Sequence, residues 1–503
     1  HSWRSKAPLV HRATPQWFIS MESHKLRDKA LKAINDTTFY PSKGKERLKS
    51  MIETRPDWCV SRQRVWGVPL PIFVNKETKE ILVDDEVNET IASIYEKEGS
   101  DCWFSDDPQR FLGSKYKSED YDKLSDIVEV WFDSGSTHSF VLEKREDLKW
   151  PASMYLEGSD QHRGWFHSSL LESCGTRGRA PFETILSHGF VVDGKGLKMS
   201  KSLGNVIAPE DILKKYGADI LRIWVASSNY SEDLRIDYSI LDQHAESYRK
   251  IRNTFRYLLG NIKDNFEEID FEKVNLNELP ELEQFMLHKL HSLNINFKKY
   301  FKNYDFHNLY KELLNFCTVD LSAFYFDIRK DTLYCDPKDS KKRQSTILLL
   351  NIILNSLLKW FAPILSFTTE EIYRLLFKDT KTIHLEKFLE FPANFANEKL
   401  NLKWVELIKI RNICNISIEE KRANKEIGSS LEAELNIHLD HKFREIIKDI
   451  DFSELCITSD AKISFKENLE VSVHTTKAKG TKCTLCWKIN QNACDRAHCP
   501  KNT

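Results

Sequence analysis

The sequence predicts a multidomain protein in which an α/β region is followed by an all-α bundle and then by a small α/β region with a cysteine-rich tail. Short apolar runs alternate with helical stretches in the first part of the chain, and amphipathic helical periodicity replaces them from about residue 231. Hydrophobic residues make up 41% of the 503 and charged residues 30%. That balance is typical of a globular protein with several buried cores, not of a disordered chain.

Residues 1–228 form the first predicted domain, whose strands are short runs of β-branched and aromatic residues bounded by Asp, Gly or Ser. Helices are predicted at 161–173 and at 209–216, where Ala-Pro-Glu-Asp makes a favourable first turn. Strands separated by helices favour a parallel sheet. Residues 76–123 are polar, lack this alternation and are interpreted as an insertion. The predicted strands are 127–132, 153–157 and 184–192.

A helical bundle is predicted over residues 229–398. Apolar residues recur there at three- and four-residue steps, the spacing that places them on one face of a helix. Glycine is nearly absent and proline is confined to a few breaks, so long uninterrupted helices are expected. The first helix is marked by Leu241, Ala245, Tyr248, Ile251, Phe255, Leu258 and Ile262, and the pattern returns at 285–301, 309–326 and 347–376.

The C-terminal part of the chain has a different composition. Residues 399–476 combine one helix with short alternating runs such as 433–439, which predicts a small α/β domain. The last segment, 477–503, holds six Lys or Arg residues against one Asp, together with four of the eleven cysteines. This segment is therefore predicted to be a separate tail.

The bulk properties exclude several classes of protein. The net charge of −1 excludes a polycation, so any contact with nucleic acid must come from local basic patches. Eleven cysteines, an odd number, with no secretory signal ahead of them favour a reducing cytoplasm without disulfides. The most apolar stretch, 347–361, is too short and too polar to span a bilayer, and it is interpreted as a buried helix. We therefore expect a cytoplasmic protein without a membrane segment.

The strongest chemical signal is the loop at 194–205, which reads Gly-Lys-Gly-Leu-Lys-Met-Ser-Lys-Ser-Leu-Gly-Asn. Its glycines and serines allow the backbone to approach a ligand closely. Lysines on flexible stems suit a pyrophosphate leaving group, whose charge grows as its bond breaks. A solvated basic turn is the alternative for any loop of Lys and Ser. The ordered string Lys198-Met199-Ser200-Lys201-Ser202, between a predicted strand and a predicted helix, favours the triphosphate interpretation.

This string resembles the signature loop of the class I aminoacyl-tRNA synthetases. The resemblance implies the second half of a Rossmann-like catalytic domain, followed by an anticodon-binding bundle. It implies that Lys201 contacts the phosphates of ATP, bound with Mg²⁺, and stabilises the transition state of adenylate formation, with Lys198 assisting. Met199 and Ser200 would complete the ATP-binding loop. His188, in Ser-His-Gly-Phe, resembles the residue on the adenine side, with an ordinary core histidine as the alternative.

Three further segments resemble the isoleucine-specific branch of this family. Residues 57–69 are similar to a segment shared by the isoleucine, valine and leucine enzymes. The string Val-Trp-Phe-Asp-Ser-Gly-Ser at 130–136 narrows the choice among these three enzymes. The string Glu-Gly-Ser-Asp-Gln-His-Arg-Gly-Trp-Phe at 157–166 narrows it most, because the valine and leucine enzymes have other sequences there. A valine-specific sister enzyme and a tRNA-binding fragment without catalysis remain the alternatives.

The resemblance also implies an isoleucyl-adenylate site. Glu157 follows a predicted strand, and ligands bind beyond the carboxyl ends of strands in open α/β sheets. A helix-start carboxylate favoured by the helix dipole is the alternative for Glu157, and ordinary core packing is the alternative for the two tryptophans. Asp160 and Gln161 are expected to reach the ribose or the ammonium group. The implied adenylate-binding residues are Glu157, Gly158, Asp160, Gln161, Trp131 and Trp165, with the tryptophans walling the aliphatic side chain.

The first helix of the predicted bundle carries Arg249, Arg252 and Arg256 near one face. In the family such bundles bind the anticodon stem and loop of tRNA. Arginines there would contact phosphates and make binding dependent on salt. A solvated helix face is the alternative that the bare sequence allows. The implied partners are tRNA(Ile), isoleucine and ATP, and the implied full-length protein is a monomer.

The tail contains Cys483-x-x-Cys486 followed by Cys494 and Cys499, a spacing at which four thiolates can share one tetrahedral Zn²⁺. The family's C-terminal zinc module usually has two Cys-x-x-Cys pairs, and here the second pair is replaced by Cys494-x4-Cys499. Cys499 or His498 would complete the site, unless the site is degraded. A redox-active pair is the competing interpretation, which the missing thioredoxin-like context disfavours.

The second signature of the class, His-x-Gly-His, is missing from the sequence, and the chain opens without an initiator Met. Because a pocket alone separates isoleucine from valine by only about 100-fold, members of this branch carry a hydrolytic editing domain, and residues 1–19 resemble the return from it. We therefore expect an incomplete portion of an isoleucine-activating enzyme. On its own, this portion is not expected to form the adenylate.

Overall fold

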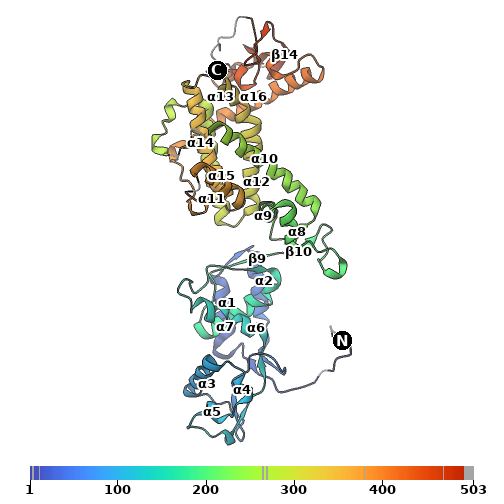
Figure 1. Cartoon of the computed structure of the whole chain (residues 1–503), viewed down its shortest axis with the longest axis vertical. Coiled ribbons are helices and arrows are strands. Elements are labelled where there is room, and N and C mark those ends of the chain that lie inside the picture. Colours follow the sequence, from blue (N-terminus) through green and yellow to red (C-terminus); the bar gives the residue numbers. More distant parts are fainter. Residues whose placement is uncertain are drawn as a thin grey trace. The chain divides into compact units, whose positions relative to one another are not determined.

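A computed structural model describes residues 1–2, 5–10, 12–262, 266–267, 270–378, 380–467 and 470–491 (Figure 1). The chain divides into two compact units. Unit 1 contains residues 1–191 and 230–234, and unit 2 contains residues 192–229 and those from 235 onward. Within the described ranges, no helix has the length and apolarity needed to cross a bilayer. None of the nine cysteines that are described forms a disulfide.

Unit 1 is built around a parallel sheet with the strand order β2-β9-β8. These strands are β2 (Thr38–Tyr40), β9 (Thr184–His188) and β8 (Tyr155–Gly158), and α1 (Leu26–Asp36), α2 (Lys43–Glu53) and α7 (Trp165–Arg177) lie beside them (Figure 1). Their apolar side chains form one buried core that includes Ile34, Phe166, Leu170 and Ile185. The predicted parallel sheet is confirmed, because both strand pairs are parallel.

Two of the predicted strands change their limits in the structure. The strand expected at 184–192 ends at His188, and a second strand, β10 (Val191–Asp193), begins after Gly189 and Phe190. The strand expected at 127–132 is wrong beyond its first two residues. Only β7 (Ile127–Val128) is extended, and α6 (Val130–Gly135) follows at once. A short aromatic and β-branched run fits a strand or a buried helical turn equally well, and here packing against α7 selects the helix.

Glu129 marks the point at which β7 ends. Its carboxylate accepts hydrogen bonds from Trp58 Nε1 at 3.0 Å and from Arg62 Nη2 at 2.8 Å. Both partners come from the neighbouring strands β3 (Trp58–Cys59) and β4 (Ser61–Arg62), which precede Glu129 by about 70 residues. The carboxylate therefore ties the start of α6 to the edge of unit 1.

The segment interpreted as an insertion, 76–123, packs with Phe73 just before it into a small hydrophobic cluster, in which Phe73, Trp103 and Phe111 are almost completely buried. Trp103 donates a hydrogen bond from Nε1 to the carbonyl oxygen of Leu124 at 2.7 Å. The remaining elements of unit 1 are β1 (Phe18–Ile19), β5 (Phe73–Asn75), α3 (Asp85–Glu98), α4 (Cys102–Ser105), α5 (Gln109–Leu112), β6 (Tyr121–Lys123), a π-helical turn (His138–Leu142) and a 3₁₀ turn, η4 (Ser159–His162).

The first two α-helices of unit 2 are α8 (Pro209–Tyr216) and α9 (Ala218–Ser227), and α9 is bonded to the bundle. The predicted helix at 209–216 is confirmed. The Asp219 carboxylate accepts hydrogen bonds from the backbone N–H and the hydroxyl of Thr368, at 2.8 and 2.6 Å. Arg222 donates to the carbonyl oxygen of Ile364 at 3.0 Å. These polar contacts place α9 against α15 (Ser366–Phe377), which explains why residues 192–229 group with the helical unit.

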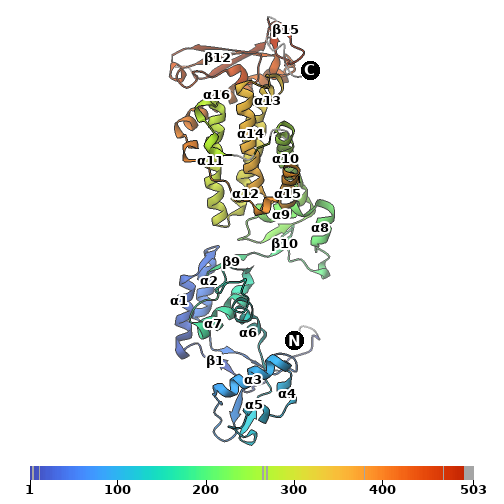
Figure 2. The ribbon, with the colours of Figure 1, turned by 60° about the vertical axis from the view of Figure 1, so that its left-hand side comes forward.

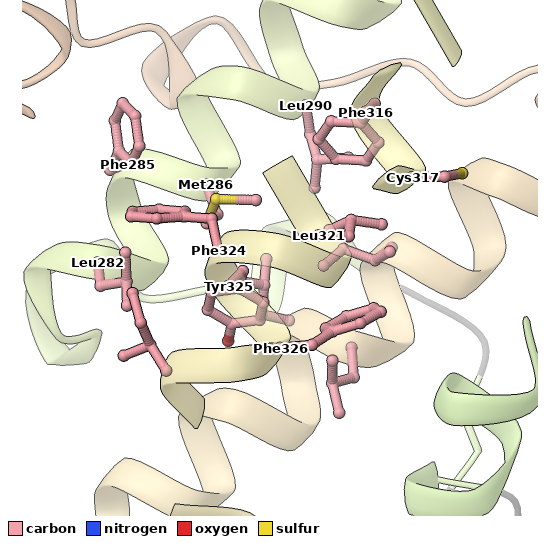
Figure 3. Packing of buried hydrophobic residues seen from close by; sticks show 14 of the residues in the cluster. Leu282, Phe285, Met286, Leu290, Phe316, Cys317, Leu321, Phe324, Tyr325 and Phe326 are labelled. Carbon is pink, nitrogen blue, oxygen red and sulfur yellow. The ribbon is translucent and has the colours of Figure 1, made fainter. Parts of the chain in front are cut away.

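The helical periodicity predicted from residue 229 onward is confirmed. The long helices α11 and α14 run side by side and α10 packs against α14 (Figure 2). Figure 3 shows Phe316, Leu321 and Phe324 gathered with Phe285 and Met286 in the buried core. The helices are α10 (Tyr238–Ile262), α11 (Glu281–Lys302), α12 (Phe306–Asn315), the π-helix η9 (Phe316–Tyr325), α13 (Phe326–Cys335), α14 (Lys341–Phe361) and α16 (Glu398–Ala423).

The C-terminal part of unit 2 contains a mixed sheet with the strand order β13-β12-β14. Its strands are β12 (Ala433–Leu439), β13 (Asp460–Phe465) and β14 (Ser472–Lys477), and α16 packs against β14. Residues of β12 alternate between buried and half-buried, as its sequence predicts. The remaining elements of this part are the short helix α17 (Phe452–Leu455) and the paired strands β15 (Thr481–Lys482) and β16 (Ile489–Asn490). Earlier in the chain, β11 (Leu234–Ile236) pairs with β10.

Candidate active site

The predicted site residues fall into two sets, one in each unit. In unit 1, Trp131, Gln161 and Trp165 converge at the start of α7. Gln161 accepts a hydrogen bond from the backbone N–H of Trp165 at 3.0 Å, and its amide donates to Asp160 Oδ2 at 2.9 Å. Trp165 stacks on Tyr155 of β8, with ring centroids 4.0 Å apart and planes within 2°. The sheet, the 3₁₀ turn and the helix therefore hold these side chains in one arrangement.

Gly164 allows the Trp131 ring to approach the start of α7 closely. A Cβ at this position would lie 2.5 Å from Gln161 Oε1 and 2.8 Å from an atom of the Trp131 ring. Trp165 Nε1 also donates to the carbonyl oxygen of Ser134 at 2.9 Å, which fixes α6 against α7. Trp131 is 40% exposed, so one face of this large aromatic side chain is left open to a ligand. The two tryptophan side chains therefore form an apolar wall beside the polar side chains of Asp160 and Gln161.

Glu157 lies at the end of β8, where it pairs in register with Ser187 of β9. Its side chain is exposed, and its carboxylate makes no hydrogen bond within the part of the chain that the structure describes. Gly158, the next residue, lies opposite His188. The His188 Nδ1 lies 2.8 Å from the carbonyl oxygen of Gly189, so one ring nitrogen is occupied and Nε2 is the one left for a ligand. Glu157 and His188 are thus at the carboxyl edge of the parallel sheet.

A buried carboxyl group packs next to this arrangement, and no feature of the sequence predicted it. Glu172 of α7 is only 8% exposed, and a Cβ on Gly135 of α6 would lie 2.1 Å from its Oε1. Burial, and secondarily the charge of Asp133, raises the pKa of Glu172 to about 9. The carboxyl group is therefore protonated at neutral pH, and α6 can pack directly on it.

In unit 2, Asp193 and Asn205 clamp the signature loop. Asp193 Oδ1 accepts the backbone N–H groups of Lys195 and Leu197, at 3.0 and 2.8 Å. Its Oδ2 accepts from Asn205 Nδ2 at 2.9 Å, and Asn205 Oδ1 accepts the N–H of Ser200 at the same distance. The Asn205 hydrogen bond and the two backbone donors hold the pKa of Asp193 below its usual value. The clamp therefore stays intact at neutral pH.

The loop presents its lysines to solvent. Lys195, Lys198 and Lys201 are exposed, and their ammonium groups form no ion pair or hydrogen bond with any residue in the described ranges. Ser200 caps a short 3₁₀ turn by accepting the N–H of Leu203 at 3.3 Å. Three unneutralised cations on a clamped loop form a site that attracts a polyphosphate. The clamp residues could have been suspected from the Asx residues at both ends of the loop.

The three predicted arginines share one face of α10. Arg249, Arg252 and Arg256 are all exposed. Arg249 pairs with Glu246 at 2.9 Å, and Arg252 donates to the hydroxyl of Tyr248 at 2.9 Å. Arg252 also lies 3.7 Å from a carboxylate oxygen of Glu371 on α15. All of these contacts are solvent-exposed, so they leave the arginines accessible to phosphate.

Two of the predicted metal ligands lie on a hairpin. Cys483 and Cys486 lie between β15 and β16, and the N–H of Leu485 donates to Cys483 Sγ at 3.4 Å. Cys494 and Cys499, and also His498, lie outside the described residues. No group of three or more metal-binding side chains occurs in the described ranges.

Two family models match the chain. The model described as "tRNA synthetases class I (I, L, M and V)" matches residues 6–237, and that described as "Anticodon-binding domain of tRNA ligase" matches residues 283–437. Two solved structures share the fold. A leucine enzyme–tRNA complex from Agrobacterium radiobacter K84 aligns with 68% of this chain and 43% of its own at a TM-score of 0.50 and 18% identity. Methionyl-tRNA synthetase from Mycobacterium tuberculosis aligns with 75% of this chain and 68% of its own, with a TM-score of 0.51 and 14% sequence identity.

Curated relatives give a closer match. The chain is 76% identical over 99% of its length to an isoleucine–tRNA ligase of Pelagibacter ubique, and covers 55% of that protein. It is 47% identical over 97% of its length to the isoleucine–tRNA ligase of Zymomonas mobilis, and covers 53% of it. The chain thus spans about half the length of the curated relatives it matches. On these matches, the chain belongs to the class I aminoacyl-tRNA synthetases.

Proposed function

We propose that this chain supplies the aminoacyl-binding strand end, the ATP-side loop and the tRNA-binding bundle of an isoleucine–tRNA ligase, a cytoplasmic monomer in its full-length form. The isoleucine carboxylate attacks the α-phosphorus of Mg²⁺-bound ATP and displaces pyrophosphate, which gives isoleucyl-adenylate. A hydroxyl group of the terminal ribose at the 3′ end of tRNA(Ile) then attacks the adenylate carbonyl and releases AMP. The loop of three unpaired lysines carries this proposal, because a polyphosphate leaving group requires such a site.

Each residue set has a distinct role in this reaction. Lys201 and Lys198 neutralise charge that develops on the leaving pyrophosphate, while Met199 and Ser200 shape the loop around ATP. Glu157 and Gly158 would bind the adenylate at the strand end, and His188 its adenine side. Asp160 and Gln161 would bind the ribose or the ammonium group. Trp131 and Trp165 provide the apolar wall that an aliphatic side chain requires.

The proposed specificity is tested by ATP–pyrophosphate exchange with the complete gene product that contains this chain. Exchange is expected to depend on isoleucine, with valine accepted about 100-fold less efficiently because one methylene contributes only a few kcal/mol. A preference for valine would identify the sister enzyme instead. Binding of tRNA without any exchange would identify a non-catalytic tRNA-binding protein. The 503 residues alone serve as the comparison, and we expect them to give no exchange.

We also propose that the tail holds Zn²⁺ through Cys483, Cys486, Cys494 and Cys499. Support comes from the hairpin around the first pair. The N–H of Leu485 points at Cys483 Sγ, and Trp487, with a φ of +63°, donates its N–H to the Cys483 carbonyl at 3.1 Å. Donation of an N–H to sulfur favours the thiolate, which is the form that binds zinc. The bound ion would hold the two halves of the tail together.

Metal analysis of the purified protein tests the zinc site. We expect about one Zn²⁺ per chain, as for a four-thiolate site, and loss of that zinc in a Cys483→Ser/Cys486→Ser variant. Cys102→Ser provides the matched control, because Cys102 is buried in the small cluster of unit 1. The proposal is wrong if the serine variant keeps its zinc or if the wild-type protein contains none.

A further inference from the structure

Unit 1 contains a cavity that lies apart from the sites described so far. Its volume is about 370 Å³, within the range of cavities that bind small organic ligands. Most of its lining is apolar and comes from Ile19, Leu26, Trp58, Phe132 and Leu171. None of the residues assigned above to ATP, isoleucyl-adenylate, zinc or tRNA lines it. The cavity therefore has no role in the proposed reaction.

Glu172 of α7 gives this apolar cavity a polar group. Its side chain is 8% exposed, and its carboxyl oxygens form no hydrogen bond with any residue in the described ranges. Because burial keeps this carboxyl group protonated at neutral pH, it carries one O–H donor and one acceptor oxygen. A buried polar group without a partner costs free energy, and a ligand that bonds to it recovers that cost.

The imidazole of His138 is a second buried polar group in the lining. It is 1% exposed, and its Nδ1 lies 3.0 Å from the carbonyl oxygen of Gly135, so Nδ1 is the protonated nitrogen. Nε2 has no partner in the part of the chain that the structure describes. Burial lowers the pKa of His138, so the ring is neutral and Nε2 is an acceptor. The two unpaired groups of the lining are thus both uncharged.

Arg177 is the charged side chain of the lining, and it is already paired. Its guanidinium donates to both carboxylate oxygens of Glu143 at 2.8 Å and to the hydroxyl of Ser139 at 3.0 Å. An ionised ligand would therefore find no countercharge left for it among the described residues of the lining. Because burying a charge without a partner is costly, the cavity favours an uncharged ligand.

The cavity and the proposed isoleucine site share α6, which packs against α7 (Figure 1). Phe132 of α6 lines the cavity, whereas the preceding residue, Trp131, belongs to the apolar wall of the isoleucine site. The carbonyl oxygen of Ser134 accepts the hydrogen bond from Trp165 Nε1 at 2.9 Å, so α6 also holds the second tryptophan of that wall. A molecule that fills the cavity therefore bears on the helix that positions both tryptophans.

We propose that this cavity is an effector site for a small uncharged molecule with an apolar body and one hydroxyl or carboxamide group. The apolar body packs against Trp58 and Phe132, and the polar group bonds to the Glu172 carboxyl and the His138 imidazole. Occupation of the cavity changes the affinity for isoleucine through α6. This effect rests on the proposed function and goes beyond it, because the reaction itself requires no second ligand.

Binding is tested with the complete gene product that contains this chain and with three probes of similar size. The probes are 2-phenylethanol, ethylbenzene, which lacks the hydroxyl group, and phenylacetate, which is charged. Saturation-transfer NMR titration is expected to give 2-phenylethanol a Kd on the order of 1 mM, usual for so small a ligand. Ethylbenzene is expected to bind about 10-fold more weakly and phenylacetate not to bind. Tighter binding of phenylacetate than of the alcohol would contradict an uncharged site.

Two variants assign the binding to this cavity. Glu172→Leu removes a buried carboxyl group that has no partner, so the fold is retained. It is expected to weaken 2-phenylethanol about 10-fold and to leave ethylbenzene unaffected. Gly175→Leu places a side chain in the lining, where its Cβ meets only Leu26 at 3.7 Å, and it is expected to abolish binding of both probes. Glu183→Leu, at an exposed position outside the cavity, is the matched control and is expected to change neither affinity.

Calorimetric titration of isoleucine with and without saturating 2-phenylethanol tests the effector role. The Kd for isoleucine is expected to change about five-fold or more in wild-type protein and not to respond to the alcohol in Gly175→Leu. The proposal is wrong if the alcohol does not bind, if Gly175→Leu still binds it, or if the Kd for isoleucine does not change. If isoleucine itself does not bind in the absence of the alcohol, the proposed function fails, whereas the probe titrations still test the cavity.

Discussion

Replacing Lys201 by methionine in the complete gene product that contains this chain is expected to lower the rate of isoleucine-dependent ATP–pyrophosphate exchange by about 10²–10³-fold, the usual effect of removing one electrostatic contact to a transition state. Lys201 is exposed and its ammonium has no carboxylate partner within the described chain, so its charge is available to the leaving pyrophosphate. Methionine keeps the apolar stem and removes only the charge. The effect is therefore expected in kcat more than in the KM for isoleucine, because the contact strengthens as the bond breaks.

Lys214→Met is the matched control for this experiment. Lys214 is exposed on α8, in the same unit, and forms no ion pair with a described residue. Its replacement is expected to leave exchange unchanged within about two-fold, as for a solvated surface charge. Lys198→Met is expected to have an intermediate effect. Equal losses in the Lys201 and Lys214 variants would show that the general charge of the unit, not a specific phosphate contact, promotes exchange.

Replacing Arg329 by methionine is expected to lower the free energy of unfolding of unit 2 by about 3–5 kcal/mol, the cost of leaving one partner of a buried ion pair alone. Arg329 of α13 is 3% exposed and Glu283 of α11 is 0% exposed. Two parallel hydrogen bonds join them, at 2.6 and 2.7 Å. Arg329 also contacts Glu454 of α17 at 2.6 Å, so this side chain links the bundle to the C-terminal part of the unit. Urea unfolding followed by circular dichroism measures the change.

A double-mutant cycle distinguishes the ion pair from simple loss of packing. The Glu283→Met/Arg329→Met variant is expected to lose clearly less than the sum of the two single variants, because neither charge is left buried without its partner. Arg422→Met removes a solvent-exposed pair with Glu419 on α16 and is expected to cost at most about 1 kcal/mol. Additive single effects at Glu283 and Arg329 would contradict the assignment of a coupled buried pair.

Helices and strands whose residues follow a clear local pattern were predicted correctly from the sequence. Three- and four-residue spacing of apolar residues predicted α10, α11 and α14, because a helix that covers a core must bury one face along its whole length. Ala-Pro-Glu-Asp predicted the start of α8 at Pro209, and strict alternation predicted β12. The strand predicted at 127–132 was wrong beyond Val128. From Val130 onward the chain folds into α6, which packs against α7 from another part of the chain, and local composition does not contain that contact.

The sequence by itself determined the chemistry of the two sets of site residues. The ordered lysine string and the Glu-Gly-Ser-Asp-Gln-His-Arg-Gly-Trp-Phe segment specify charges and hydrogen-bonding groups at short spacing, so their chemistry can be read locally. Only the tertiary structure decided what supports them. Glu172 keeps its proton because residues distant in sequence remove it from water, and Glu283 tolerates its charge because Arg329 lies 46 residues further along the chain. Solvent exclusion depends on every neighbouring element at once, and no stretch of sequence specifies it alone.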